Sequence, residues 1–404
     1  MKKTILAAFV SILIGLILTE ITLNLFFPIG DPYKEDKEGR ALIREYIETQ
    51  HEPNLFYRFY SEPGLSGMDD STRFTTNNLG FRGPYLERPK TSNEYRVFMV
   101  GGSTTECIRL DDSLAITYLL QEYLNSHIDD SISIKVYNAG KSGDKTYDHL
   151  AMLVHRIMHL EPDLIIIFCG FNDLTAAAYN KDYIHLPVYQ TVPQIKFSNY
   201  IKFLLTEFQI PRRLYYGLRP ILSDESTEEI QMRISFTSNY KEKARLNNEH
   251  PISSSQPRVD LVPYKTNLIS IIGLAQVNDA DLVFMTQATS WNSKIDPQTR
   301  EWHWTTYKNG VRYKEAYLDQ ALEEYNDVMR NVSGEFRIPL FDTYKLVPKS
   351  LEYFYDDCHF NINGSIYTSD LLGDFILREI DFHDRDNSDS NRHIKLTKSG
   401  KKNF

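Results

Sequence analysis

The chain has few cysteines and no excess of positive charge, and both shortages exclude classes of protein. Three cysteines among 404 residues are too few for a disulfide scaffold, and their odd number leaves at least one thiol unpaired within a monomer. No Cys-x-x-Cys pair and no cluster of cysteine and histidine occurs, so we expect no zinc, no other metal and no cofactor. The net charge of −9 argues against nucleic acid as a partner, because broad binding to it requires a dominant cationic face.

Charge is also nearly missing from residues 4–27, where Glu20 is the only charged residue. As a helix this apolar run would be about 36 Å long, which is enough to cross a bilayer. Lys2 and Lys3 precede it, so the positive-inside rule predicts a cytoplasmic N-terminus and a periplasmic or extracellular location for the rest of the chain. A cleaved signal peptide and a buried core helix are the alternatives. No small-x-small cleavage site follows the run, which favours a single-pass membrane anchor over residues 1–30.

The remaining sequence divides into a lead-in, one large domain and a tail. Residues 31–90 combine mixed charge with Pro and Gly and predict a linker followed by an extended segment. Residues 91–382 have the length and apolar content of a single domain, interrupted by insertions at about 176–260 and 288–312. Residues 383–404 are polar and nearly free of aromatics, which predicts a disordered tail. No pattern indicates an oligomeric state.

Short apolar runs alternate with segments of helical period across the large domain. The runs cover residues 95–100, 134–138, 164–168, 282–286 and 338–342. Two of the segments between them place apolar residues on one helical face: Ile116, Leu119, Leu120 and Tyr123 in the first, and Leu150, Leu153, Val154 and Ile157 in the second. Strands this apolar are buried on both faces, so the pattern predicts an α/β fold of three layers with a doubly wound, parallel, five-stranded sheet. Ligands of such sheets bind beyond the carboxyl ends of the strands.

The first apolar run ends in Gly101-Gly102-Ser103, directly before a helix. A serine between a strand and a helix presents its hydroxyl at the carboxyl edge of the sheet, where a nucleophile must be exposed. The amides at the start of the helix can also stabilise an oxyanion. The alternative is that Ser103 only caps the helix.

The next two runs also end in residues that suit an oxyanion site. The second run leads into Asn138-Ala139-Gly140, and the third is followed by Gly170-Phe171-Asn172-Asp173. The Gly140 amide and the Asn172 side chain could complete an oxyanion hole with the amide of Ser103. Since Gly and Asn are common in turns, two ordinary turns are the alternative.

An Asp-x-x-His pattern follows the fifth run, at Asp356 and His359. On one turn, the carboxylate of Asp356 would orient the imidazole, and His359 would then accept the proton of Ser103. The pattern alone is weak, because a second copy occurs at Asp182 and His185. That copy lies within the first insertion, and we expect it to be a polar surface segment.

With these four blocks in order, the chain resembles the SGNH, or GDSL-like, hydrolases, in particular a membrane-anchored bacterial branch. The resemblance covers about residues 95–380. It implies that Ser103 is the nucleophile, that His359 is the base oriented by Asp356, and that the oxyanion donors are Ser103, Gly140 and Asn172.

The sequence departs from the usual pattern of this family in two places. Gly102 stands before the serine where the name of the family implies Asp, and the last gap is longer than a compact member needs, so substrate choice would depend on the insertions. Residues 78–83, with Gly-Phe-Arg, are similar to a lead-in of the same branch. Arg82 therefore either faces the site or, as we expect, forms a structural ion pair.

An acyl-enzyme on Ser103 would lead to hydrolysis or to transfer of the acyl group to a sugar hydroxyl. The complete set of residues favours an esterase that cleaves a carboxylic ester, its acyl group carried by a surface glycan or lipid. An O-acyltransferase and an inactive, membrane-tethered carbohydrate-binding module are the alternatives. Trp291, Trp302 and Trp304, all in the second insertion, are candidates for stacking on sugar rings, although tryptophans more often pack in a core.

Two further features allow a simple and a functional interpretation. The three cysteines lie beside the proposed catalytic blocks, at Cys107, Cys169 and Cys358, and we expect small buried apolar side chains rather than reactive thiols.

Residues 196–219 mix basic and aromatic side chains, a composition that suits a membrane interface. A cover over the core or the site is the alternative that we favour for this segment.

Overall fold

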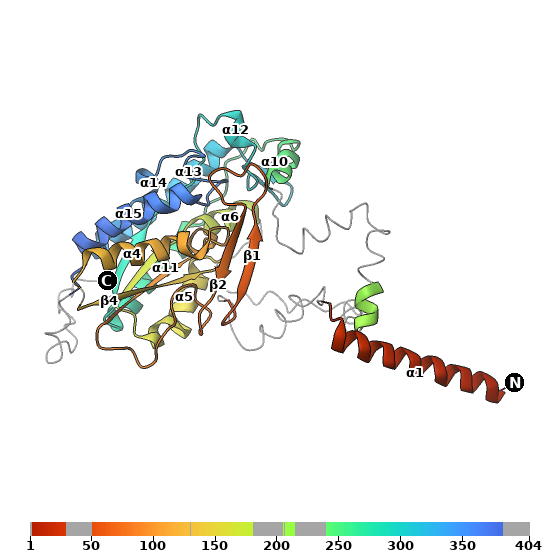
Figure 1. Cartoon of the computed structure of the whole chain (residues 1–404). Helices are drawn as coiled ribbons and strands as arrows, with labels where there is room; N and C mark the ends of the chain where they lie inside the picture. The colour runs from red at the N-terminus through yellow and green to blue at the C-terminus, as the bar shows by residue number, and fades with distance from the viewer. Residues whose placement is uncertain are drawn as a thin grey trace, which may run out of the picture.

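The computed structural model describes residues 2–29, 51–129, 131–180, 205, 207–214 and 240–382 (Figure 1). The predicted disordered tail, most of the first insertion and linker, and the Asp182–His185 copy of the histidine pattern lie outside these residues. Helix α1 (Lys2–Phe26) contains one run, Thr4–Phe26, with a mean hydropathy of 2.3 and no buried residue. It is therefore long and apolar enough to cross a membrane.

A parallel sheet of five strands forms the centre of the domain, as predicted. Its strands in spatial order are β4 (Ser133–Gly140), β3 (Glu94–Gly101), β5 (Leu164–Phe168), β6 (Asp281–Met285) and β9 (Leu340–Phe341). Numbered along the chain, this order is 2-1-3-4-5, a doubly wound order in which the direction of winding reverses between β3 and β5. The strand β9 is shorter than predicted, and the preceding Pro339 has no amide to donate to a longer ladder.

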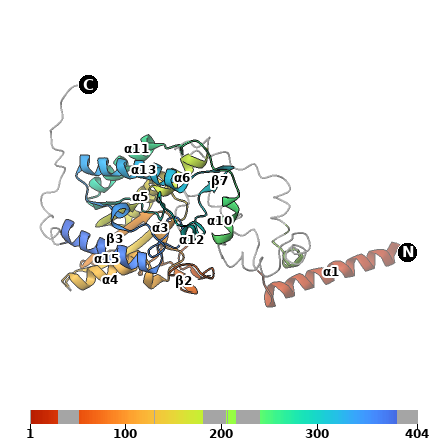
Figure 2. The same cartoon turned by 90° about the horizontal axis from the view of Figure 1, so that it is seen from above.

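Helices cover both faces of the sheet and bury separate clusters of apolar side chains (Figure 2). On one face lie α5 (Thr146–His155), α11 (Leu261–Val277) and α13 (Glu315–Phe336), which pack on Phe98 and Val100. On the other lie α4 (Ile116–His127) and α15 (Ile362–Glu379), which pack on Val97 and Met99. Because successive residues of β3 point to opposite faces, this apolar strand contributes to both clusters.

The predicted helical faces are correct except at Val154. Ile116 and Leu120 of α4 are buried, and Leu153 of α5 is buried as well. Val154 is 39% exposed, while Met152 is buried in its place. The helix ends at His155, and Ile157 begins the short 3₁₀ helix η2 (Ile157–Leu160), so the face does not continue as the period implies.

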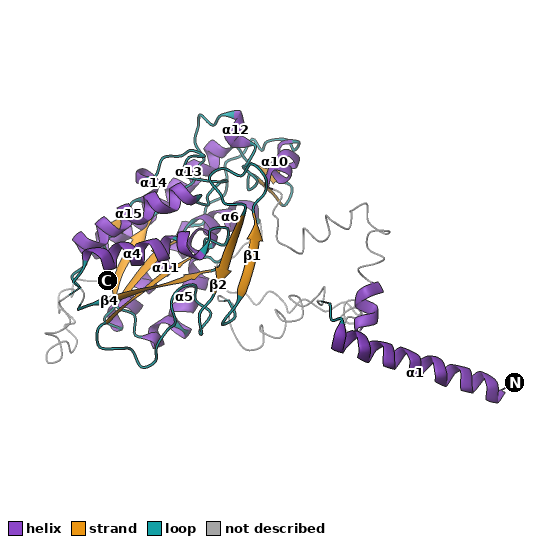
Figure 3. Cartoon of the chain, viewed as in Figure 1, coloured by secondary structure: helices purple, strands orange, loops and turns teal. Residues whose placement is uncertain are grey.

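The remaining elements are short and lie mostly in the connections. They are β1 (Phe56–Tyr60), β2 (Ser71–Thr75), α3 (Ser103–Glu106), η1 (Asp112–Leu114), α6 (Phe171–Tyr179), α10 (Tyr240–Asn248), α12 (Pro297–Arg300), β7 (Tyr307–Lys308), β8 (Val311–Arg312) and α14 (Thr343–Leu346). The second insertion consists largely of loop, with α12 and the β7–β8 pair within it (Figure 3).

Arg82 has a structural role, as we expected. Its buried guanidinium pairs with Asp112 at 2.8 Å and donates to the carbonyls of Glu106, Cys107 and Leu110 at 3.0, 2.7 and 2.5 Å. These carbonyls belong to the last residue of α3 and to the turn that follows it. Arg82 therefore holds in place the segment behind the predicted nucleophile, and it does so through contacts that a lysine could not reproduce.

The sharp exit from β3 requires glycine at position 101. A Cβ atom there would overlap the Thr105 hydroxyl and the Phe168 carbonyl. Gly101→Ala should therefore lower the free energy of unfolding by about 1–3 kcal/mol, the usual cost of overpacking, as measured by urea unfolding followed by circular dichroism. Gly273→Ala is the matched control: nothing lies within 4 Å of its Cβ position in α11, so stability should stay the same or rise by up to about 1 kcal/mol. Equal midpoints for Gly101→Ala and the wild type would disprove the close approach.

Candidate active site

Ser103 lies at the start of α3, at the carboxyl end of the interior strand β3. The residue that caps this helix is Gly102, so the Ser103 side chain does not serve as the cap. Its hydroxyl instead lies 2.8 Å from Nε2 of His359. Within the described part of the chain, the backbone amides of Ser103 and Thr104 donate to no other group, as is typical of the first turn of a helix. The predicted nucleophile thus lies beside free amide donors.

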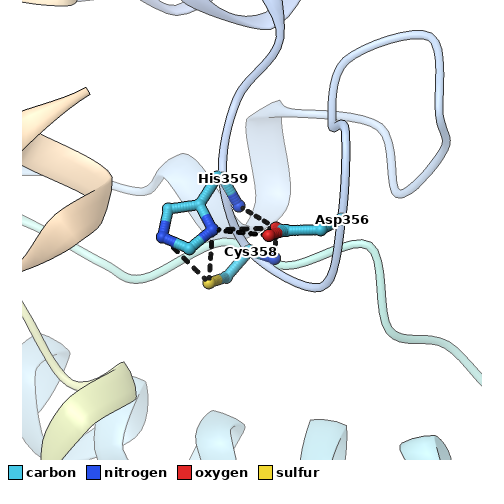
Figure 4. A group of neighbouring side chains, drawn as sticks. All are labelled: Asp356, Cys358 and His359. Carbon is cyan, nitrogen blue, oxygen red and sulfur yellow. Dashed lines mark hydrogen bonds and ion pairs between the residues drawn. The ribbon is translucent and has the colours of Figure 1, made fainter. Parts of the chain in front are cut away.

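His359 and Asp356 lie on one turn between α14 and α15, as the Asp-x-x-His spacing predicted (Figure 4). The Nδ1 atom of His359 is 2.9 and 2.8 Å from the two carboxylate oxygens of Asp356. The backbone amides of Cys358 and His359 also donate to Oδ1 of Asp356, at 3.0 and 2.9 Å. The carboxylate therefore fixes both the backbone of the turn and the plane of the ring. Ser103, His359 and Asp356 form one continuous chain of hydrogen bonds, the geometry of a serine nucleophile with its base.

The charges of Asp356 and His359 shift each other's pKa. Burial alone would raise the pKa of Asp356, but the charge of His359 and hydrogen bonds from His359 and Trp304 outweigh it and hold this pKa below its usual value. Burial alone would lower the pKa of His359, and the neighbouring Asp356 outweighs it, so this pKa is raised. A base with a raised pKa accepts a proton more readily, provided that the pH is high enough to leave it neutral.

The second insertion supports the Asp356 carboxylate directly. The indole N–H of Trp304 donates to Oδ2 of Asp356 at 3.0 Å. The next residue, Asp357, is buried and accepts the backbone amides of Trp304 and Thr305 at 2.8 and 3.1 Å and the Trp291 indole at 2.7 Å. Sequence reasoning missed this role, because no local pattern links residues so far apart in the chain.

Asn172 lies in the first turn of α6, just after β5, and its side-chain nitrogen donates to the Asp144 carbonyl at 2.8 Å. A Cβ atom on Gly102 would lie 2.5 Å from this nitrogen, so the glycine permits the approach of Asn172 to the serine. The amide group carries a second hydrogen, which is available to a ligand. The adjacent Asp173 has a different function: it is buried and binds the amide and hydroxyl of Thr146 at the start of α5.

The prediction that Gly140 supplies an oxyanion donor is wrong. Its amide donates to Oδ1 of Asn138 at 2.9 Å, and a Cβ atom there would lie 2.8 Å from the Cα of Glu106, behind α3. Gly143 fits better, because it has a φ of +87° and its amide donates to no group within the described residues. It directly precedes Asp144, which holds Asn172. In the sequence, this turn is marked by Ser142-Gly143-Asp144, three residues beyond Gly140.

A small pocket of about 200 Å³ opens beside Ser103. Its walls include Thr104, Gly170, Phe171 and Gln287 in addition to Ser103 and Asn172. Gln287 follows β6 and is buried, and its backbone is fixed by two hydrogen bonds with Asn326, at 2.9 and 3.0 Å. Its position at the carboxyl end of a strand was the signal that sequence reasoning missed.

The cysteines are buried and unpaired, as expected. Burial raises the pKa of Cys107, Cys169 and Cys358, so these thiols are not poised for reaction. Donor atoms of Asp356, Cys358 and His359 lie within 4.8 Å of one another, a spacing that could hold a metal ion. We assign no metal to them, because the carboxylate and the imidazole bind each other and the neighbouring thiol stays protonated.

No protein-family model and no curated protein matches the chain. Similar solved structures include a GDSL-like lipase from Bacteroides thetaiotaomicron, with a TM-score of 0.39, 14% identity, and coverage of 73% of this chain and 93% of that one. A lipase/acylhydrolase from Enterococcus faecalis has a TM-score of 0.36, 17% identity, and coverage of 71% and 95%. An acetylxylan esterase from Geobacillus stearothermophilus has 0.38, 15%, and coverage of 71% and 94%. At these values the likeness alone establishes neither a shared family nor a shared substrate.

Removing the indole donor should change the pKa of His359. In Trp304→Phe, the Asp356 carboxylate loses the hydrogen bond from the indole. Its negative charge is then less neutralised and stabilises the protonated imidazole more strongly, so the pKa of His359 should rise. The pKa is measured by NMR titration of the imidazole, and the signal is identified by its loss in His359→Gln.

Trp302→Phe is the matched control for this change. It lies in the same insertion and is buried, but within the described residues its indole N–H donates to no group, so the pKa of His359 should stay the same. An unchanged or lower pKa of His359 in Trp304→Phe would show that the indole contributes packing alone.

Proposed function

We propose that this chain is a serine ester hydrolase of the SGNH type that removes short acyl groups from esters. The observation that carries the proposal is the chain of hydrogen bonds from Ser103 through His359 to Asp356, next to unpaired amide donors and a small pocket. These are the parts that acyl transfer through a covalent serine ester requires. The resemblance of the sequence to this family points to the same chemistry.

In the proposed reaction, His359 accepts the proton of Ser103 as Oγ attacks the carbonyl carbon of the ester. The negative charge that develops on the carbonyl oxygen faces the amides of Ser103 and Gly143 and the free hydrogen of Asn172. The tetrahedral species then collapses, and the alcohol leaves with the proton from His359. A water molecule, deprotonated by His359, next attacks the acyl-enzyme and releases the carboxylic acid and the free Ser103 hydroxyl.

The pocket supports a short acyl group, such as acetyl. Its volume is only about 200 Å³, and Thr104, Phe171 and Gln287 stand close around Ser103 in its walls. The Gln287 wall cannot retreat easily, because Asn326 holds its backbone and its own side-chain amide donates to the Ala288 carbonyl at 3.0 Å. This polar wall also offers a long alkyl chain no apolar surface.

Hydrolysis is favoured over transfer to a sugar, because water needs no second binding site. Trp291 and Trp302 are buried and present no face to a sugar ring. The Trp304 indole is engaged with Asp356, and the Lys243 ammonium lies 5.0 Å from its ring. An inactive binding module would have no use for a complete and aligned set of serine, histidine and aspartate. We place the reaction outside the cytoplasm, with α1 as the anchor and an acyl group on a surface glycan or lipid as substrate.

Ser103→Ala should abolish hydrolysis of p-nitrophenyl acetate, because loss of a triad nucleophile lowers kcat by about 10⁶. Asn172→Ala removes one oxyanion donor and should lower kcat by about 10² to 10³. Circular dichroism should show both variants folded, and Ser126→Ala, an exposed serine on α4, is the matched control with unchanged activity. Wild-type turnover by Ser103→Ala would end the proposal.

The length of the acyl chain tests the pocket. We expect kcat/KM to fall about ten- to hundredfold from acetate to butyrate esters, because forcing the extra methylenes into a packed site costs about 1–3 kcal/mol in all. Gln287→Ala should reduce this preference by opening the wall, whereas Gln276→Ala, an exposed residue on α11, should leave it unchanged. Equal kcat/KM for acetate and octanoate in the wild type would rule out a short acyl group.

A further inference from the structure

A segment of the first insertion binds the end of the apolar helix α1. Residues 207–214 include one helical turn, which lies beside α1 in both views (Figures 1 and 2). The carboxylate of Glu20, the only charge in the apolar run, accepts the backbone amides of Gln209 and Ile210, the latter at 2.9 Å. The negative charge of Glu20 is thus stabilised by hydrogen bonds from backbone amides at the start of this turn.

Two arginines extend the contact to the residues that follow α1. The guanidinium of Arg212 donates to the Ile29 carbonyl at 2.9 Å, and that of Arg213 donates to the Phe27 carbonyl. The side chain of Gln209 accepts the Ile29 amide at 2.9 Å. Phe27 and Ile29 lie just beyond α1, so these side chains bind the backbone where the chain leaves the helix.

The hydrogen bonds of α1 fit an apolar environment, where each polar group needs a partner within the protein. The hydroxyls of Ser11, Thr19 and Thr22 donate to the carbonyls four residues earlier, at 3.0, 2.8 and 2.8 Å. Glu20 cannot be satisfied in this way, because a carboxylate is only an acceptor. Its partners come from residues 209 and 210, far away in the sequence.

The depth of Glu20 indicates where this segment lies. Glu20 precedes Phe26, the last residue of the span, by six positions, which is about 9 Å along a helix. Amphipathic helices in the membrane interface lie about 5–10 Å deep. Leu205, Phe208 and Leu214 are exposed on the segment, at 49%, 51% and 58%, while its arginines lie at the level where α1 ends.

We propose that residues 205 and 207–214 lie in the membrane interface, with Leu205, Phe208 and Leu214 among the acyl chains of the lipid and the arginines at the headgroups. The partner of this surface is a phospholipid bilayer, and Glu20 is the residue that ties the segment to α1. The segment belongs to the first insertion and lies in the chain between α6, which carries Asn172, and α10. This segment is thereby a second membrane contact, besides α1.

This inference rests on the proposed membrane anchor, and the experiment separates the two. The full chain is placed in nanodiscs of phosphatidylcholine and phosphatidylglycerol, with an environment-sensitive fluorophore on Phe208→Cys, Ile12→Cys or Tyr118→Cys. The native cysteines are buried and remain unlabelled. Spin-labelled phospholipids should quench the fluorophore at positions 208 and 12 but not at position 118, which is exposed on α4.

Variants of α1 test the role of Glu20. Glu20→Leu should abolish quenching at position 208 and keep it at position 12, whereas Asn24→Leu, an exposed polar residue of the same helix, should change neither. Quenching at position 12 without quenching at position 208 would overturn this inference and leave the anchor intact. No quenching at position 12 would overturn the anchor itself. Unchanged quenching at position 208 in Glu20→Leu would show that Glu20 does not tie the segment to α1.

Discussion

The candidate active site depends on one buried carboxylate, that of Asp356. A buried charge without partners would cost several kcal/mol, so the chain must supply donors to it from every side. Two backbone amides of its own turn, the imidazole of His359 and the indole of Trp304 do so. Because these donors come from two distant parts of the chain, the carboxylate can be buried only when the turn and the second insertion are both folded against it.

The sheet explains why these groups meet at Ser103. The order of the strands reverses direction between β3 and β5, and the loops after these two strands therefore separate and leave an opening at the carboxyl edge. Ser103 follows β3 and Asn172 follows β5, so the opening is bordered by the proposed nucleophile and by one proposed oxyanion donor. Gly101 and Gly102 let α3 and Asn172 approach the strand end more closely than any side chain would permit.

Sequence reasoning succeeded where a single segment carries the information. The five strands, the serine after two glycines, and the Asp-x-x-His turn are all local patterns, and the structure brings Ser103, Asp356 and His359 together as expected. It failed where the outcome depends on contacts between segments. Gly140 has the right place in the sequence, but the side chain of Asn138 takes its amide. The roles of Trp304 and Gln287 depend on contacts with residues distant in the sequence, which neither hydrophobic periodicity nor motif spacing predicts.

The charges around the pocket determine whether an oxyanion can form there. Burial and the charge of Asp148 raise the pKa of Asp144, which contributes to the pocket wall, to about 8. At neutral pH this carboxyl group is therefore mostly protonated, and it adds no negative charge beside the developing oxyanion. Asp356 is the ionised carboxylate next to His359, and it stabilises the imidazolium on the opposite side of the serine. Of these two carboxyl groups, the ionised one therefore lies beside the proposed base and the one in the pocket wall is mostly neutral, a difference that favours the transition state of the proposed acyl transfer.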